Sequence, residues 1–108
     1  MGNKVLIVED DQAIVRLMKI ALQTNGYEPI VANTGINGIA AFLRENPDLV
    51  LLDMGLPDVD GSEVLTQIRD ISSVPIIIVS AREQEKEKVK ALDQGANDYV
   101  TKPFGIDE

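Results

Sequence analysis

The chain has 108 residues, of which 44% are hydrophobic, and this length suits one domain with a core of its own. It contains no cysteine and no histidine, which excludes disulfides, the usual zinc sites and histidine-based catalysis. Its formal charge of −8 repels phosphate backbones, so the chain by itself is not expected to bind nucleic acid.

Five apolar segments are predicted to be strands. Residues 5–8, 49–52 and 76–79 are continuous aliphatic runs that do not alternate with polar residues. Both faces of such strands must be buried, which is typical of the centre of a parallel sheet. Two weaker candidates lie at residues 29–32 and 98–101.

Amphipathic segments between these strands predict four helices. In the first helix, Asp11 is a candidate cap, and Asn25 and Gly26 end it. The second helix starts near Thr34 and stops before Pro47. The predicted buried faces are Ile14, Leu17, Met18, Ala21 and Leu22 in the first helix, and Ile36, Ile39, Ala40 and Leu43 in the second.

The third predicted helix follows the turn at Asp60 and Gly61, with Ser62 as a candidate cap, and the fourth ends at Gly95. Their predicted apolar faces are Val64, Leu65 and Ile68, and then Val89 and Leu92. Strict alternation of strands and helices implies a parallel sheet with helices on both faces.

Acidic residues follow two of the predicted central strands. Residues 5–8 run into Glu9, Asp10 and Asp11, and residues 49–52 run into Asp53. If the two strands are adjacent, these carboxylates converge and raise each other's pKa. A hard divalent cation removes that cost, and carboxylates with a backbone carbonyl and water suit Mg²⁺ or Mn²⁺.

A purely structural interpretation of these acids is also open. Asp10 or Asp11 can be a helix cap, and Asp53 can be an ordinary loop residue. For Asp11 we favour the cap. For Asp10 and Asp53, spacing alone leaves both the metal site and the structural interpretation open.

Two further strand ends carry matching chemistry. Ser80 follows residues 76–79, and Lys102 follows residues 98–101. Singly, the serine can be a helix cap and the lysine a surface residue. Together with the acids they predict a phosphoryl site, in which Asp53 attacks phosphorus while the hydroxyl and the ammonium contact the phosphoryl oxygens.

These segments resemble the receiver domain of bacterial two-component response regulators, and among these the OmpR/PhoB type. The matching motifs are Val8-Glu9-Asp10-Asp11, Leu52-Asp53-Met54-Gly55-Leu56-Pro57-Asp58-Val59-Asp60-Gly61, Val79-Ser80-Ala81, Gly95-Ala96-Asn97-Asp98-Tyr99 and Lys102-Pro103-Phe104. The resemblance implies a flavodoxin-like (CheY-like) doubly wound α/β fold with strand order 2-1-3-4-5. We expect one receiver domain over residues 1–108, truncated near Ile106, where the family's fifth helix begins.

The resemblance also implies a role for each site residue. Asp53 matches the phosphorylated aspartate, and Asp10 matches the direct ligand of Mg²⁺ (Mn²⁺ being the alternative). Glu9 matches an acid that reaches the metal through water, and the backbone carbonyl of Gly55 matches a third protein ligand. Lys102 matches the lysine that contacts the phosphoryl group, with a cis peptide expected before the following proline.

Two residues match the switch of such domains, and the switch implies partners. Ser80 matches the hydroxyl that turns toward the phosphoryl group, and Tyr99 matches the aromatic that follows it. The implied partners are a sensor histidine kinase as phosphoryl donor, and a second receiver that pairs through the fourth helix and residues 98–101. DNA is expected only through an output domain absent from these 108 residues.

The sequence also bears on where the protein is located in the cell. No apolar run approaches the ~20 residues that cross a bilayer, and the start of the chain has no cleavage pattern, so no membrane partner and a cytoplasmic location are expected.

A haloacid-dehalogenase-type hydrolase needs a second acid where Gly55 stands, and a flavodoxin-type cofactor would meet repelling acids after residues 5–8. An independent enzyme is therefore not expected, beyond catalysis of the domain's own phosphotransfer and dephosphorylation. A degenerate receiver that serves only as an interaction module is the remaining alternative.

Overall fold

The computed structural model describes residues 3–82 and 84–102, which form alternating strands and helices. The strands are β1 (Lys4–Val8), β2 (Glu28–Ala32), β3 (Leu49–Leu52), β4 (Ile76–Ser80) and β5 (Asp98–Thr101). The helices are α1 (Gln12–Thr24), α2 (Gly35–Glu45), α3 (Gly61–Arg69) and α4 (Glu85–Asp93). The predicted alternation is confirmed over this part of the chain.

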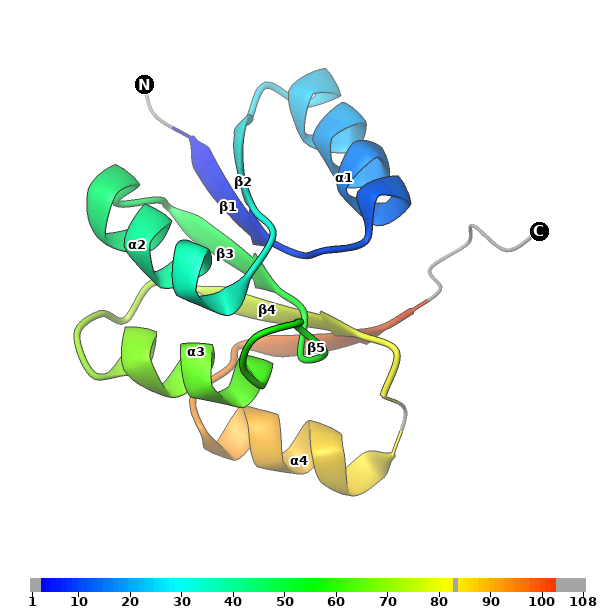
Figure 1. Cartoon of the computed structure of the whole chain (residues 1–108), viewed down its shortest axis with the longest axis vertical. Coiled ribbons are helices and arrows are strands. Elements are labelled where there is room, and N and C mark those ends of the chain that lie inside the picture. Colours follow the sequence, from blue (N-terminus) through cyan, green and yellow to red (C-terminus); the bar gives the residue numbers. More distant parts are fainter. Residues whose placement is uncertain (1–2, 83, 103–108) are drawn as a thin grey trace.

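The strands form one parallel sheet in the order β2-β1-β3-β4-β5, which confirms the expected fold class. Helices α2, α3 and α4 cover one face and α1 lies on the other (Figure 1). Val8 is level with Leu52, and Leu52 is level with Ile78. The carboxyl ends of the central strands therefore meet at one edge of the sheet, where a doubly wound fold places its ligands.

Alternation along the strands divides the core into two layers. Leu6 and Val8 belong to the larger layer under α2, α3 and α4, whereas Ile7 faces α1. In the middle of the sheet both faces are shielded from solvent, because Leu6 and Ile7 are fully buried. This confirms that the continuous aliphatic runs are central strands.

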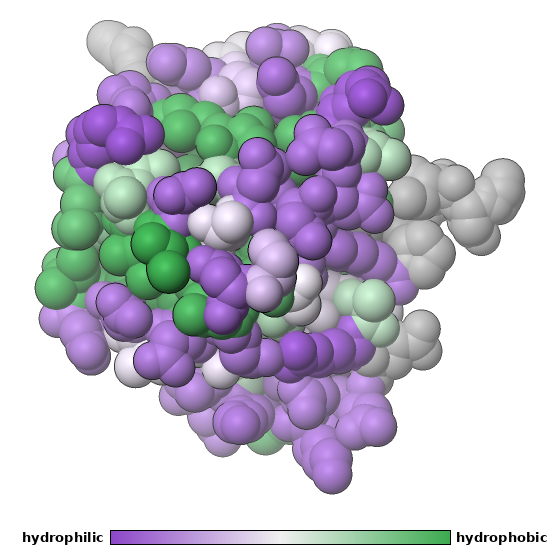
Figure 2. Space-filling view, viewed as in Figure 1, coloured by the Kyte–Doolittle hydropathy of each residue, from purple (hydrophilic) through white to green (hydrophobic). Residues whose placement is uncertain are grey.

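Helix α2 turns a different face to the sheet from the one we predicted. Three of the predicted buried residues are exposed: Ile36, Ala40 and Leu43. The buried residues are instead Gly35, Gly38, Ala41 and Phe42. At Gly38, an added Cβ would lie 2.8 Å from Cγ1 of Val8. Because the helix backbone approaches the strand this closely, the large side chains on its other sides face solvent, and they form the apolar surface over α2 in Figure 2.

The predicted face of α4 is also wrong. Val89 and Leu92 are 48% and 45% exposed, while Ala91 is fully buried. Here too a small side chain makes the contact and the larger apolar ones point away from it. In α1 the error is smaller: Leu17 and Ala21 are exposed, whereas the other predicted residues pack on the core.

Of the two predicted caps, one is confirmed and one is wrong. Asp11 caps α1, because its Oδ1 accepts from the N–H groups of Ala13 and Ile14. Ser62 is not the cap of α3, since Asp60 holds that position and accepts from both the backbone N–H and the hydroxyl of Ser62.

Some predictions fall outside the described residues. The cis peptide before Pro103 and the start of a fifth helix near Ile106 belong to this group. Among the helices that are described, none combines the length and the apolar character that a bilayer crossing requires.

Candidate functional site

The predicted acids converge at the carboxyl edge of the sheet. Asp53 follows β3, and its N–H donates to the carbonyl of Val8 at the end of β1 (3.0 Å). This bond places Asp53 beside Glu9 and Asp10, which follow β1. One carboxylate oxygen from each of the three acids lies within 4.8 Å of the others.

Burial distinguishes these three acids. Glu9 is 1% exposed and Asp53 is 6% exposed, whereas Asp10 is open to solvent. Two acids are therefore held in the protein while the third faces the solvent from which an ion would enter. Oxygen donors of this kind and number suit a hard divalent cation that keeps several of its waters.

Lys102 partly balances the buried negative charge. Its Nζ lies 2.9 Å from Oε1 of Glu9 and 3.5 Å from Oδ1 of Asp53. Burial alone would lower the pKa of the Lys102 ammonium, but its hydrogen bond and charge interaction with Glu9 and the charge of Asp53 outweigh burial and hold that pKa above its usual value. The lysine therefore remains charged at neutral pH.

Glu9 has unused capacity to accept a proton or a ligand. Burial raises the pKa of its carboxyl, with a contribution from the Asp53 charge, against the opposing effects of Lys102 and the Asp11 N–H. Oε1 lies 2.9 Å from Nζ of Lys102 and has no other hydrogen-bond donor among the described residues, while Oε2 accepts from the N–H of Asp11 (3.1 Å). A buried acceptor in this condition fits a site where a metal-bound water would donate to it.

These residues line a crevice of about 450 Å³ at the edge of the sheet. Its wall is formed by Glu9, Asp10, Asp11, Asp53, Gly55, Ser80, Ala81, Arg82 and Lys102. Every residue predicted for the metal or the phosphoryl group is therefore present in one hollow. Tyr99 does not line it, but its hydroxyl donates to the carbonyl of Arg82 in the loop that follows β4.

Arg82 connects the two predicted switch residues. Its backbone N–H donates to the hydroxyl of Ser80 (3.1 Å), and its carbonyl accepts from the hydroxyl of Tyr99 (2.9 Å). Ser80 is buried and Tyr99 is partly buried. The backbone of Arg82 is thus bonded to both side chains in the structure.

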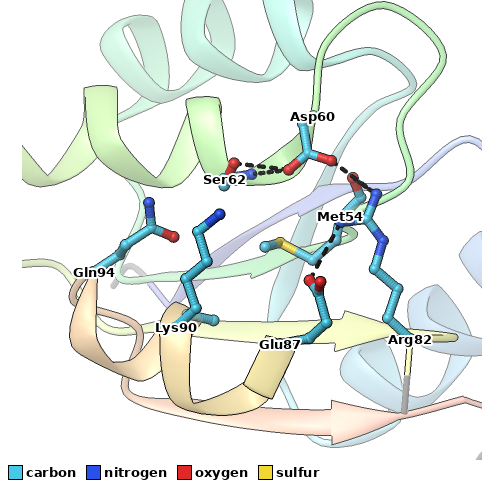
Figure 3. A pocket seen from close by; sticks show the side chains of 8 residues that line it. Met54, Asp60, Ser62, Arg82, Glu87, Lys90 and Gln94 are labelled. Carbon is cyan, nitrogen blue, oxygen red and sulfur yellow. Dashed lines mark hydrogen bonds and ion pairs between the residues drawn. The ribbon is translucent and has the colours of Figure 1, made fainter. Parts of the chain in front are cut away.

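The side chain of Arg82 extends away from the crevice into a second hollow between α3 and α4, shown in Figure 3. Its guanidinium lies 2.8 Å from Oδ1 of Asp60 and 3.7 Å from Oε1 of Glu87, and it reaches the carbonyl of Met54 at 3.5 Å. The ion pair with Asp60 raises the pKa of the guanidinium. One residue therefore connects the loop after β4 to the start of α3 and to α4.

Comparison with known proteins identifies the family. The model of the response regulator receiver domain matches residues 5–108. The chain belongs to the response regulator receiver family. Within this family, the motifs Gly55-Leu56-Pro57-Asp58 and Lys102-Pro103-Phe104-Gly105-Ile106 indicate a likeness to KdpE regulators, and the similarity to KdpE proteins confirms it.

KdpE of Mycobacterium tuberculosis is 47% identical over 104 residues, and the match covers 96% of this chain and 46% of that protein. KdpE of Escherichia coli is 49% identical over 106 residues, covering 98% of this chain and 47% of that protein. The receiver thus spans about half the length of the curated relatives that it matches.

Solved structures agree with the fold. The BeF3-activated receiver domain of Klebsiella pneumoniae RstA has a TM-score of 0.91 and 31% identity, covering 96% of this chain and 89% of that one. The Mn²⁺-bound form of the response regulator Rcp1 has a TM-score of 0.88 and 30% identity, covering 97% of this chain and 84% of that one.

Sequence reasoning missed three residues whose side chains connect the loops at this edge of the receiver to neighbouring helices: Asp58, Asp60 and Arg82. All three make their contacts with residues at least 22 positions away in the chain, as well as with near neighbours. For Arg82 there was a signal, since a long cation directly follows the Ser80-Ala81 motif. For Asp58 and Asp60, the sequence shows only acids in a turn.

Proposed function

We propose that this receiver accepts a phosphoryl group on Asp53 from the phosphohistidine of a sensor histidine kinase. An oxygen of the Asp53 carboxylate attacks phosphorus, the new O–P bond forms as the P–N bond breaks, and the electron pair of that bond leaves with the imidazole. The observation that carries the proposal is the convergence of three carboxylates and an ammonium in one crevice.

The residues of the crevice divide the work. Mg²⁺, or Mn²⁺, would be held by Asp10, Asp53 and the Gly55 carbonyl, with Glu9 acting through water, and would supply positive charge against the phosphoryl oxygens. Lys102 lies close enough to Asp53 to contact an oxygen of the group once it is attached.

A labelling experiment tests this function. Incubation with a phosphorylated kinase, or with acetyl phosphate, should give an acid-labile, hydroxylamine-sensitive label that depends on Mg²⁺. Asp53→Asn should remove the label. Asp48→Asn is the matched control, because Asp48 lies at the other end of β3, where it accepts from the N–H of Lys4. Equal labelling of both variants would exclude Asp53 as the acceptor.

The phosphoryl group would act through Ser80 and Tyr99. The Ser80 hydroxyl would leave the N–H of Arg82 for a phosphoryl oxygen, and Tyr99, bonded to the carbonyl of Arg82, would follow the movement of that loop. A coupling of ~1–3 kcal/mol is enough to change the affinity for a partner about 5–150-fold.

The output of the switch would be pairing of two receivers through α4 and β5. Val89 and Leu92 of α4 are exposed and offer an apolar contact surface. In a longer regulator, pairing would bring two DNA-binding output domains together. Sedimentation with and without beryllofluoride, on this chain and on one extended through a fifth helix, tests it. Equal dimerisation of the two chains would exclude the extra helix from the contact.

A further inference from the structure

The loop that carries Gly55 is fastened to a neighbouring helix by one carboxylate. This loop connects β3 to α3 over residues 53–60. From it, Asp58 extends to the start of α2, where Oδ1 accepts from the N–H of Gly35 (2.8 Å) and Oδ2 accepts from the N–H of Ile36 (2.9 Å). Oδ1 also accepts from the N–H of Val59, within the loop itself (2.9 Å).

These bonds complete the start of α2. The first N–H groups of a helix have no partner within the helix and need an outside acceptor. The cap residue Thr34 serves only Asn37, through its Oγ1 (3.0 Å). Asp58 serves the two groups that remain before the helical pattern begins, and its negative charge is favourable at this end of a helix. The hydrogen bonds from Ile36 and Gly35 hold the pKa of the Asp58 carboxyl below its usual value.

Packing reinforces the same contact. A Cβ on Gly35 would overlap Cγ2 of Val59, so the loop lies directly against the first turn of α2. The two ends of the loop are joined to each other, because the N–H of Gly61 donates to the carbonyl of Met54 (2.8 Å) and Gly55 forms an isolated bridge with Asp60. Between these ends, Asp58 fastens the loop to α2.

We propose that Asp58 is a positioning residue for the metal site: by fastening the loop to α2 it holds the Gly55 carbonyl at the crevice. The inference rests on the proposed function, because it takes Gly55 as a ligand. A backbone carbonyl can coordinate an ion only as well as its loop is held. Among the described residues, Asp58 makes the loop's side-chain hydrogen bonds to α2, while Asp60 bonds the loop to α3 and Arg82.

The test compares two caps of the same helix. Asp58→Ala removes the bonds between loop and helix, whereas Thr34→Ala removes a cap bond that lies within α2 and leaves the loop fastened. Mg²⁺ affinity is measured by calorimetric titration of each full chain, with Asp58→Asn as a milder variant should the alanine variant fold poorly. We expect Asp58→Ala to weaken Mg²⁺ binding about 10-fold. This is the lower end of the loss of affinity seen when a residue that orients a metal ligand is removed. Thr34→Ala should bind as the unchanged chain does.

Salt separates positioning from charge. Asp58→Ala also removes a negative charge near the ion, but that effect shrinks as salt rises, since the Debye length is ~8 Å at 0.15 M and ~3 Å at 1 M. A loss of affinity that persists in 1 M salt supports positioning. A loss that disappears in high salt, or an equal loss in Thr34→Ala, overturns it.

Amide exchange without metal distinguishes this inference from the proposed function. In the metal-free protein, the Gly61 amide should exchange several-fold faster in Asp58→Ala than in Thr34→Ala, because the whole loop has lost its attachment. If the unchanged chain fails to bind Mg²⁺, the proposed function fails, and exchange still decides whether Asp58 holds the loop. Unchanged exchange in Asp58→Ala overturns the positioning role.

Discussion

Helices α3 and α4 lie next to each other on one face of the sheet, and each has nine residues, but they are held in different ways (Figure 1). Helix α3 buries three large side chains, Val64, Leu65 and Ile68, none of them more than 1% exposed. Helix α4 buries only Ala91 among its described residues. Apolar burial therefore anchors α3 far more strongly than α4.

The start of α3 is also held more firmly than the start of α4. The Asp60 carboxylate caps α3, whereas the cap residue of α4, Gln84, makes no side-chain cap bond. Two ion pairs of Arg82 partly compensate, because they connect the loop before α4 to Asp60 and to Glu87 (Figure 3). Helix α4 is therefore held less firmly than α3. This difference makes α4 the better candidate for the moving element of the proposed switch.

The largest expected effect is on α3. Leu65→Ala should lower the free energy of unfolding by about 2–5 kcal/mol, because it leaves a cavity in a closed core. Leu92→Ala is the matched control, and since Leu92 is 45% exposed its effect should stay within about 0.5 kcal/mol. Urea unfolding measures both. Similar losses at the two positions would contradict the difference in anchoring.

The alanine contact of α4 can be tested by enlarging it. Ala91→Leu should cost about 1–3 kcal/mol, because Ala91 is fully buried and a larger side chain at this position pushes the helix outward. Hydrogen exchange should speed up in α4 and remain slow in α3. A variant as stable as the parent, with α4 still protected, would show that α4 is not seated on this residue.

Removing Arg82 tests the compensation. Arg82→Ala should lower stability by no more than ~1 kcal/mol, because both ion pairs are partly exposed and surface pairs contribute little. The informative result is local: amides of α4 should exchange faster while those of α3 do not change. Glu63→Gln on α3 serves as the control for loss of a charge. If α4 exchanges equally fast in the two variants, Arg82 does not support that helix.

Acid should produce the smallest effect, and it should begin at the start of α3. Partial burial alone would raise the pKa of Asp60, but hydrogen bonds from Ser62 and Arg82 outweigh it and lower that pKa. A lowered folded pKa means that the stabilisation is complete above the unfolded value of about 3.9 and is lost as pH falls below it. The protection of amides in the first turn of α3, relative to their intrinsic exchange rates, should therefore decrease as the pH falls below about 4. Asp60→Asn should flatten this pH dependence. If the variant keeps the same pH dependence, another acid is responsible for it.

The strands and the residues that follow them could be predicted from the sequence alone. A run such as residues 49–52 is apolar on both sides because the strand is covered on both faces, and that pattern is local. The order of strands and the convergence of Asp53 with Glu9 and Asp10 followed from the family resemblance, and the structure confirms both arrangements. The roles of these residues, and the peptide before Pro103, stay predictions.

The buried sides of α2 and α4, and the polar residues that bond across the fold, depend on the tertiary structure. Helix α2 rests on Gly38 because its backbone fits against Val8, and no periodicity of apolar residues reveals such a close approach. The acceptors Asp58 and Asp60 bond to groups that are near them in space and 22 or more residues away in sequence. The strength of these contacts depends on distances that folding sets, and so a local pattern of residue types could not contain them.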